Sequence, residues 1–150
     1  MFRKILYPTD FSEGAKKALE YVKKLKEAGT EEVVIVHIIH EYGIDSVMEG
    51  CEWAGLNPEE CKNDVFGDMV KKEQAKAEKI LEEIEATGMK GKIRIELGNP
   101  ASKILEISED EHVSLIVMGA YGAGKIEELL LGSITEKVIR HAKVPAMAIR

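Results

Sequence analysis

Val33-Val34-Ile35-Val36-His37-Ile38-Ile39 is an almost wholly apolar run. Such a run is typical of a β-strand that is covered on both faces, as in a parallel sheet. The stretch before it, from Ser12 to about Ala28, carries apolar residues at helical spacing and stops at Gly29. It is therefore predicted to be a helix that begins with Ser12 as its N-cap. A helix followed by a buried strand indicates an α/β fold.

The same alternation continues along the chain. Strands are expected at residues 3–7, 33–39, 92–97, 114–118 and 145–149, and helices at 12–28, 68–87, from Asn99-Pro100 through Ile107, and from Ser133 onward. Five strands alternating with four helices predict a single α/β domain over residues 1–150, with a doubly wound, five-stranded parallel sheet.

Composition and charge exclude several classes of protein. The chain has 150 residues, of which 45% are hydrophobic and 32% are charged, as in a soluble globular domain. No segment reaches the ~20 apolar residues of a membrane span, and the first residues do not resemble a signal peptide, so we expect a cytoplasmic protein without a membrane partner. The net charge of −6 argues against nucleic acid as a partner.

Residues 41–67 form an acidic insertion, too long for an ordinary connection. Eight acids and one lysine between residues 41 and 68 give this stretch a net charge of −7. Short helices are expected within it, one of them starting at Asn57-Pro58. The insertion is a candidate lid or docking surface whose apolar residues cover the ligand crevice, meet a second subunit, or pack among themselves: Met48, Trp53, Leu56 and Phe66.

The two cysteines, Cys51 and Cys61, lie in this insertion and form neither a C-x-x-C pair nor a zinc-binding spacing. Because cytoplasmic proteins seldom hold disulfides, free thiols are expected.

Ligands of doubly wound sheets bind beyond the carboxyl ends of the strands, where the strand order reverses. Two loops lie there: Tyr7-Pro8-Thr9-Asp10-Phe11-Ser12 and Gly119-Ala120-Tyr121-Gly122-Ala123-Gly124-Lys125, the second followed by Gly132-Ser133. Glycines let the backbone approach a bulky anion, and a helix N-terminus at Ser133 offers free N–H donors. These loops predict a site for a polyphosphate.

Two common phosphate motifs fit poorly. Ile126 stands where a P-loop requires a hydroxyl, and Glu127 stands where the dinucleotide fingerprint requires a glycine. The spacing Gly119-x2-Gly122-x9-Gly132-Ser133, with Ile5–Ser12, Gly98–Ala101, Leu115–Gly119 and Val144–Ile149, instead resembles the ATP-binding branch of the universal stress protein family over nearly the whole chain.

This resemblance implies a Rossmann-like fold of the adenine nucleotide α-hydrolase type and an adenine nucleotide as ligand, ATP or else ADP or AMP, with Mg²⁺ or Mn²⁺. Asp10 would contact the ribose or the metal–phosphate group, Ile38 the adenine, and the glycines, Ser133 and Ile134 the phosphates. The candidate nucleotide-binding residues are Pro8, Thr9, Asp10, Ile38, Met118, Gly119, Gly122, Gly132, Ser133 and Ile134.

The loop interior departs from the family pattern. Ala120-Tyr121 replaces a small hydroxyl residue followed by histidine, and Ala123 replaces a frequent basic residue. Lys125 either supplies the missing positive charge or is merely solvated. Ser133 is also explained by helix capping with Glu136, and Asp10 by a turn.

No nucleophile–base pair is apparent, so no catalytic residue is assigned and an efficient enzyme is not expected. We predict an ATP-binding regulatory protein of the stress response, a nucleotide-dependent switch with at most slow hydrolysis. The alternatives are a metal-dependent ATPase or nucleotidyl-transfer enzyme, in which Asp10 helps to hold the metal, and a nucleotide-free dimeric scaffold. The last strand, Val144 to Ile149, is predicted to pair across a two-fold axis in a homodimer.

Overall fold

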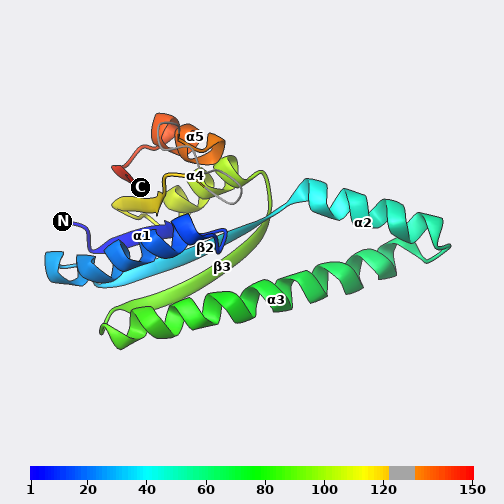
Figure 1. The fold of residues 1–150 in the computed structure, drawn as a ribbon, viewed down its shortest axis with the longest axis horizontal. Helices are drawn as coiled ribbons and strands as arrows, with labels where there is room; N and C mark the ends of the chain where they lie inside the picture. The colour runs from blue at the N-terminus through cyan, green and yellow to red at the C-terminus, as the bar shows by residue number, and fades with distance from the viewer. Residues whose placement is uncertain (122–130) are drawn as a thin grey trace.

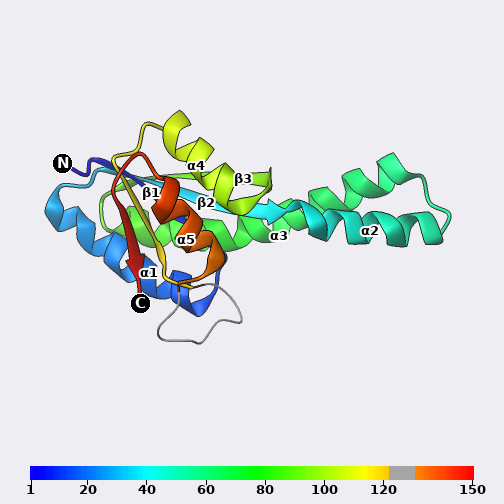
Figure 2. The same cartoon turned by 90° about the horizontal axis from the view of Figure 1, so that it is seen from above.

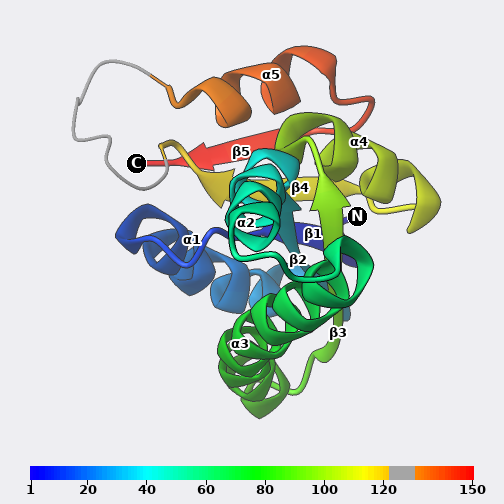
Figure 3. The ribbon, with the colours of Figure 1, turned by 90° about the vertical axis from the view of Figure 1, so that its right-hand side faces the viewer.

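The computed structural model describes residues 1–121 and 131–150. Its sheet has five parallel strands in the order β3-β2-β1-β4-β5, which is the predicted doubly wound topology (Figure 3). The strands are β1 (Lys4–Pro8), β2 (Glu32–His40), β3 (Lys90–Gly98), β4 (Leu115–Gly119) and β5 (Ala146–Ile149). The helices are α1 (Glu13–Lys24), the 3-10 helix η1 (Leu25–Ala28), α2 (Glu41–Trp53), α3 (Pro58–Ala86), α4 (Pro100–Asp110) and α5 (Ser133–His141).

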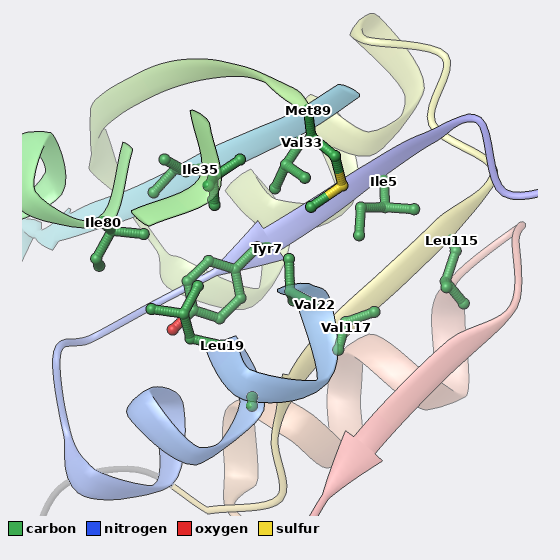
Figure 4. Packing of buried hydrophobic residues seen from close by; sticks show 12 residues of the cluster. Ile5, Tyr7, Leu19, Val22, Val33, Ile35, Ile80, Met89, Leu115 and Val117 are labelled. Carbon is green, nitrogen blue, oxygen red and sulfur yellow. The ribbon is translucent and has the colours of Figure 1, made fainter. Parts of the chain in front are cut away.

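Helices cover the sheet on both faces, and Figure 3 shows α1 and α3 on one side with α4 and α5 on the other. Strand residues therefore alternate between two cores. Figure 4 shows the core under α1 and α3, in which Tyr7, Ile35 and Val117 meet Leu19, Val22 and Ile80. The second core joins Leu6, Val34, Val36, Ile116 and Met118 to residues of α4 and α5. Burial on both faces explains the apolar run in β2.

Local signals place the element ends close to their predicted positions. Ser12 caps α1 by accepting a hydrogen bond from Ala15 N, and Gly29 ends η1 in the left-handed conformation with φ of 97°. Asn99 caps α4, and Pro100 is its first residue, as predicted. Strand β3 is longer than the predicted 92–97, because it pairs with β2 over nine residues.

The acidic insertion differs from its prediction in one respect. A helix does begin after Asn57, whose side chain accepts from the N–H groups of Glu59 and Glu60. This helix continues without a break to Ala86, so the separate helix expected to start near Asp68 is the second half of α3. No proline interrupts residues 59–86, and Gly67 alone does not end a helix.

Helix α2 and the first part of α3 form an arm, residues 41–70, that projects away from the sheet (Figures 1 and 2). Trp53 is 92% exposed and Leu56 is 56% exposed at the turn between the two helices. These two side chains therefore neither cover the ligand crevice nor pack among themselves in this conformation, while Met48 and Phe66 are half-buried.

Cys51 and Cys61 are joined by a disulfide, so the expectation of free thiols is wrong. The physical reason is the antiparallel arrangement of α2 and α3, which brings the two Cα atoms to 6.3 Å. Spacing in the sequence could not show this pairing, because it depends on the turn at residues 54–57. In the described part of the chain, no helix combines the length and apolarity that a membrane span needs.

Candidate functional site

A cavity of ≈ 280 Å³ opens at the carboxyl ends of β1 and β4, the two strands between which the order of the sheet reverses. Nine of the ten predicted binding residues line it: Pro8, Thr9, Asp10, Ile38, Met118, Gly119, Gly132, Ser133 and Ile134. The tenth, Gly122, lies outside the described residues, as does Lys125. Residues from three distant parts of the sequence thus meet in one place.

The turn between β1 and α1 is held by hydrogen bonds from its own side chains. Thr9 Oγ1 accepts from Phe11 N at 3.0 Å, and an oxygen of Asp10 accepts from Ser12 N at 3.0 Å. Phe11 adopts a φ of 63°, which is uncommon for a bulky residue. The two side-chain bonds stabilise this conformation and fix the Asp10 carboxylate at the rim of the cavity.

His37 holds the same turn from the neighbouring strand. Its Nδ1 lies 2.9 Å from the carbonyl oxygen of Thr9, and because a carbonyl only accepts, Nδ1 carries the proton. The other ring nitrogen lies 3.6 Å from a carboxylate oxygen of Glu73 in α3, and the ring packs against Phe11. The arrangement makes His37 a residue that positions the turn.

One end of the cavity is apolar. Ile38 and Met118, both predicted, are joined there by residues that sequence reasoning missed: Val36, Pro100 and Ile104. Pro100 lies in the segment Gly98–Ala101, which carries part of the family resemblance, so a signal for it was present. The sequence contained no such signal for Val36 and Ile104, which look like ordinary core residues. Such a surface suits a flat, weakly polar group such as a purine base.

The other end is formed by the N-terminus of α5. Its N-cap is Gly132, which has no side chain, so the capping role considered for Ser133 is wrong and Ser133 is the first helical residue. Helices α1 to α4 are each capped by a side chain, whereas the described residues give α5 no side-chain cap. Its first N–H groups and its partial positive charge are therefore directed at the cavity, where they suit an anion.

Gly119 lets β4 lie close against α1. A Cβ atom at Gly119 would lie 2.9 Å from the carbonyl carbon of Gly14, closer than side chains tolerate. The buried Thr135 hydroxyl donates to the Gly119 carbonyl at 2.8 Å, and Gly132 N donates to Ala120 O at 2.8 Å. Gly119 is thus required by the packing of α1 against β4, and Thr135, which lines the cavity, is a site residue that the sequence analysis missed.

The charges around the cavity are few. Asp10 is the only acidic side chain among the described lining residues, and no lysine or arginine is among them. The described residues also contain no cluster of three or more potential metal ligands. A divalent cation at this site would therefore need oxygens from its ligand, such as phosphate oxygens, in addition to Asp10.

Comparison with known proteins agrees with the geometry. The model of the universal stress protein family matches residues 1–150. Universal stress protein MJ0577 of Methanocaldococcus jannaschii is 41% identical over 157 residues, which cover all of this chain and 96% of that protein. A solved structure of MJ0577 superposes with a TM-score of 0.86, at 40% identity, over 99% of this chain and 96% of the other.

Two more distant solved structures share the fold and contain nucleotides. A universal stress protein family member from Arabidopsis thaliana with AMP bound has a TM-score of 0.61 at 19% identity, covering 97% of this chain and 90% of that one. A universal stress protein in complex with cAMP has a TM-score of 0.62 at 18% identity, covering 99% and 97% of the two chains.

Proposed function

We propose that this chain, which belongs to the universal stress protein family, binds ATP and acts as a nucleotide-dependent regulatory switch with at most slow hydrolysis. The observation that carries the proposal is the cavity at the reversal of strand order, apolar at one end and bounded by the N-terminus of α5 at the other. Relatives that hold AMP and cAMP support an adenine nucleotide as the ligand class.

In this proposal, each end of the cavity receives one part of the nucleotide. Adenine lies between Ile38, Met118 and Ile104, the phosphates accept N–H groups from Ser133 and Ile134, and Asp10 binds the ribose or a Mg²⁺ or Mn²⁺ ion on the phosphates. Gly119 and Gly132 leave room for the phosphates to approach the backbone. Pro8 and Thr9 set the position of Asp10.

Switching follows from the separate elements that meet at the cavity. A nucleotide that contacts both the β1–α1 turn and α5 would favour the arrangement in which these elements are close together. Among the described lining residues, Asp10 is the only carboxylate, and the Nδ1 proton of His37 is already donated to Thr9. Few groups are thus available to activate water, which supports slow hydrolysis.

The first test is to extract freshly purified protein and identify the released nucleotide by chromatography. The extraction is repeated after incubation with ATP and Mg²⁺ or Mn²⁺. Intact ATP retained over hours supports the switch, whereas accumulating ADP or AMP supports the metal-dependent ATPase or nucleotidyl-transfer alternative. No nucleotide in either sample, with no thermal shift on adding ATP, supports the nucleotide-free scaffold and contradicts the proposal.

Asp10→Asn tests the role of the carboxylate, since asparagine keeps the oxygen that accepts from Ser12 N. We expect the affinity for ATP with Mg²⁺ to fall roughly tenfold, as when a metal-site residue is lost. Glu13→Gln is the matched control, because Glu13 has a side chain that is 92% exposed and does not line the cavity. Equal affinities for all three proteins in titration calorimetry would remove Asp10 from the site.

We also propose that the protein acts in the cytoplasm as a homodimer that pairs through its last strand, residues 144–149. β5 is at the edge of the sheet, next to β4 alone, and Met147 is 37% exposed on it. An edge strand offers unpaired N–H and C=O groups to a second copy. Light scattering at micromolar concentration tests the assembly, and a monomer would contradict it.

A further inference from the structure

The outer part of the arm has little apolar packing of its own. Only Ile44 and Cys51 are buried among the thirteen residues of α2, and α3 has no buried residue before Ala77. An isolated helix of ~12–15 residues is marginal in water. The arm therefore depends on something other than a hydrophobic core to keep α2 against α3.

The disulfide supplies that restraint at the outer end. Cys51 is near the end of α2 and Cys61 is in the first turns of α3, ten residues apart in the chain, so the bridge closes the connecting turn. The turn is also held by backbone hydrogen bonds, including those from Gly55 N to Glu52 O and from Leu56 N to Cys51 O, each at 3.1 Å. Breaking the bridge would leave the turn and α2 held by these hydrogen bonds, the buried Ile44 and a few half-buried side chains.

We propose that Cys51–Cys61 is a reversible thiol–disulfide exchange site that controls the order of the arm. A thiolate attacks Cys61 Sγ, the more exposed of the two residues, and Cys51 leaves with the electron pair of the S–S bond and takes up a proton. A second thiol attacks the mixed disulfide and releases Cys61. Two external thiols are oxidised to one external disulfide, and the bridge gains two electrons and two protons.

The charge of the arm selects the class of thiol. Residues 41–68, which contain the bridge, carry eight acids and the single Lys62, for a net charge of −7. Glu49, Glu52, Glu59 and Glu60 are all exposed near the two cysteines in sequence. A negative surface lowers the local concentration of anionic reactants and raises that of cationic ones. The bridge thus favours cationic or neutral thiols over anionic ones.

The effect of reduction stays local. The second half of α3 is anchored to the sheet by Ala77, Ile80 and Ile84, which are buried in the core under α1 and α3 or beside it. Reduction is expected to release α2, the turn and the start of α3, while the sheet and the cavity keep their structure. The proposal does not rest on nucleotide binding. Loss of disulfide exchange should leave nucleotide binding intact, and loss of nucleotide binding should leave disulfide exchange intact.

Hydrogen exchange measured by mass spectrometry tests the proposal on the full chain. Protein purified without thiols should contain no free thiol, and neutral dithiothreitol should expose two. Amides in residues 44–57 should then exchange at least about tenfold faster, with β1 and β4 unchanged. Trp53, the only tryptophan, gives a second readout through its fluorescence.

Cys51→Ala, Cys61→Ala and the double variant separate the bridge from side-chain packing. All three should exchange like the reduced wild type, with or without dithiothreitol. Equal protection in the oxidised and reduced wild-type protein would overturn the proposal, and so would two free thiols in the protein purified without reductant.

The charge preference is tested by comparing reduction by cysteamine, which is cationic, with reduction by mercaptoethanesulfonate, which is anionic. Rates are expressed per thiolate concentration. We expect a roughly tenfold advantage for cysteamine at low ionic strength that shrinks at ~1 M salt. Replacing Glu49, Glu52, Glu59 and Glu60 together by glutamine should lower the ratio of the cysteamine rate to the mercaptoethanesulfonate rate. An unchanged ratio in this variant would exclude the acidic surface as its cause.

Discussion

Glu111 is a buried carboxylate at the end of α4, with an 8% exposed side chain that contacts three cations. Its oxygens lie 2.7 Å from Lys92 Nζ, 3.0 Å from Lys4 Nζ and 3.1 Å from Arg94 Nη1. The hydrogen bond from Lys92, reinforced by Lys4 and opposed by burial, lowers the pKa of Glu111 to about 2. The carboxylate therefore remains charged at neutral and mildly acidic pH.

Glu111→Gln should lower the free energy of unfolding by roughly 1–2 kcal/mol at pH 7, a value reduced to allow for the partly exposed cations. Because the pKa in the folded state lies below the ordinary 4.5, this stabilisation is full above pH 4.5 and is lost as the pH falls towards 2. The free energies of unfolding of the wild type and of Glu111→Gln, measured in urea, should become equal over that range. Glu109→Gln, at a 55% exposed side chain, is the control and should change little.

Tyr7 is a fully buried residue whose hydroxyl donates to the carbonyl of Ala15 in α1 at 2.5 Å. Burial raises the pKa of Tyr7 to about 12, so it stays a donor in ordinary buffers. Tyr7→Phe removes this buried hydrogen bond and should cost about 1 kcal/mol of unfolding free energy in urea titrations. Tyr21→Phe, 46% exposed on the same helix, should cost nothing measurable.

At the scale of the element, the N-terminus of α5 can be tested by adding the cap that it lacks. Gly132→Asp supplies a cap and a negative charge, so it should stabilise the protein by about 0.5 kcal/mol while weakening ATP binding at least ~10-fold. Gly132→Asn supplies a similar cap without the charge and should weaken binding less. Thermal unfolding measures the stability and calorimetry measures the affinity for ATP. An equal loss of affinity in both variants would indicate steric hindrance instead of charge.

The helices and strands also show how much of the structure could be predicted from the sequence alone. The strands and the ends of α1 and α4 were predictable because apolar periodicity, Ser12, Gly29 and Asn99 act locally. The part of the cavity that is formed by loops at the carboxyl ends of the strands was also predictable. Thr135 and the Cys51–Cys61 bridge were missed because each depends on a partner in another element, Gly119 in one case and a second helix in the other.

At the scale of the whole molecule, the two edges of the sheet differ. β3 alternates lysine, arginine and glutamate along its length, which discourages pairing with another strand, whereas β5 carries Ala146, Met147, Ala148 and Ile149. The carbonyl groups of Pro145 and Ile149 accept hydrogen bonds from Ile116 and Ala120. Successive residues of a strand point their backbone groups to opposite sides, so those of Ala146 and Ala148 face away from β4.

Ala148→Pro therefore removes an outward N–H group without removing a hydrogen bond to β4. If two copies pair through β5, this substitution should convert the dimer into a folded monomer, as measured by light scattering and circular dichroism. Ala148→Val keeps the N–H group and should remain dimeric, which separates backbone pairing from a change of side chain. A dimer that survives Ala148→Pro would require an interface elsewhere. The exposed side chains at the turn of the arm, Trp53 and Leu56, would then be the next to substitute.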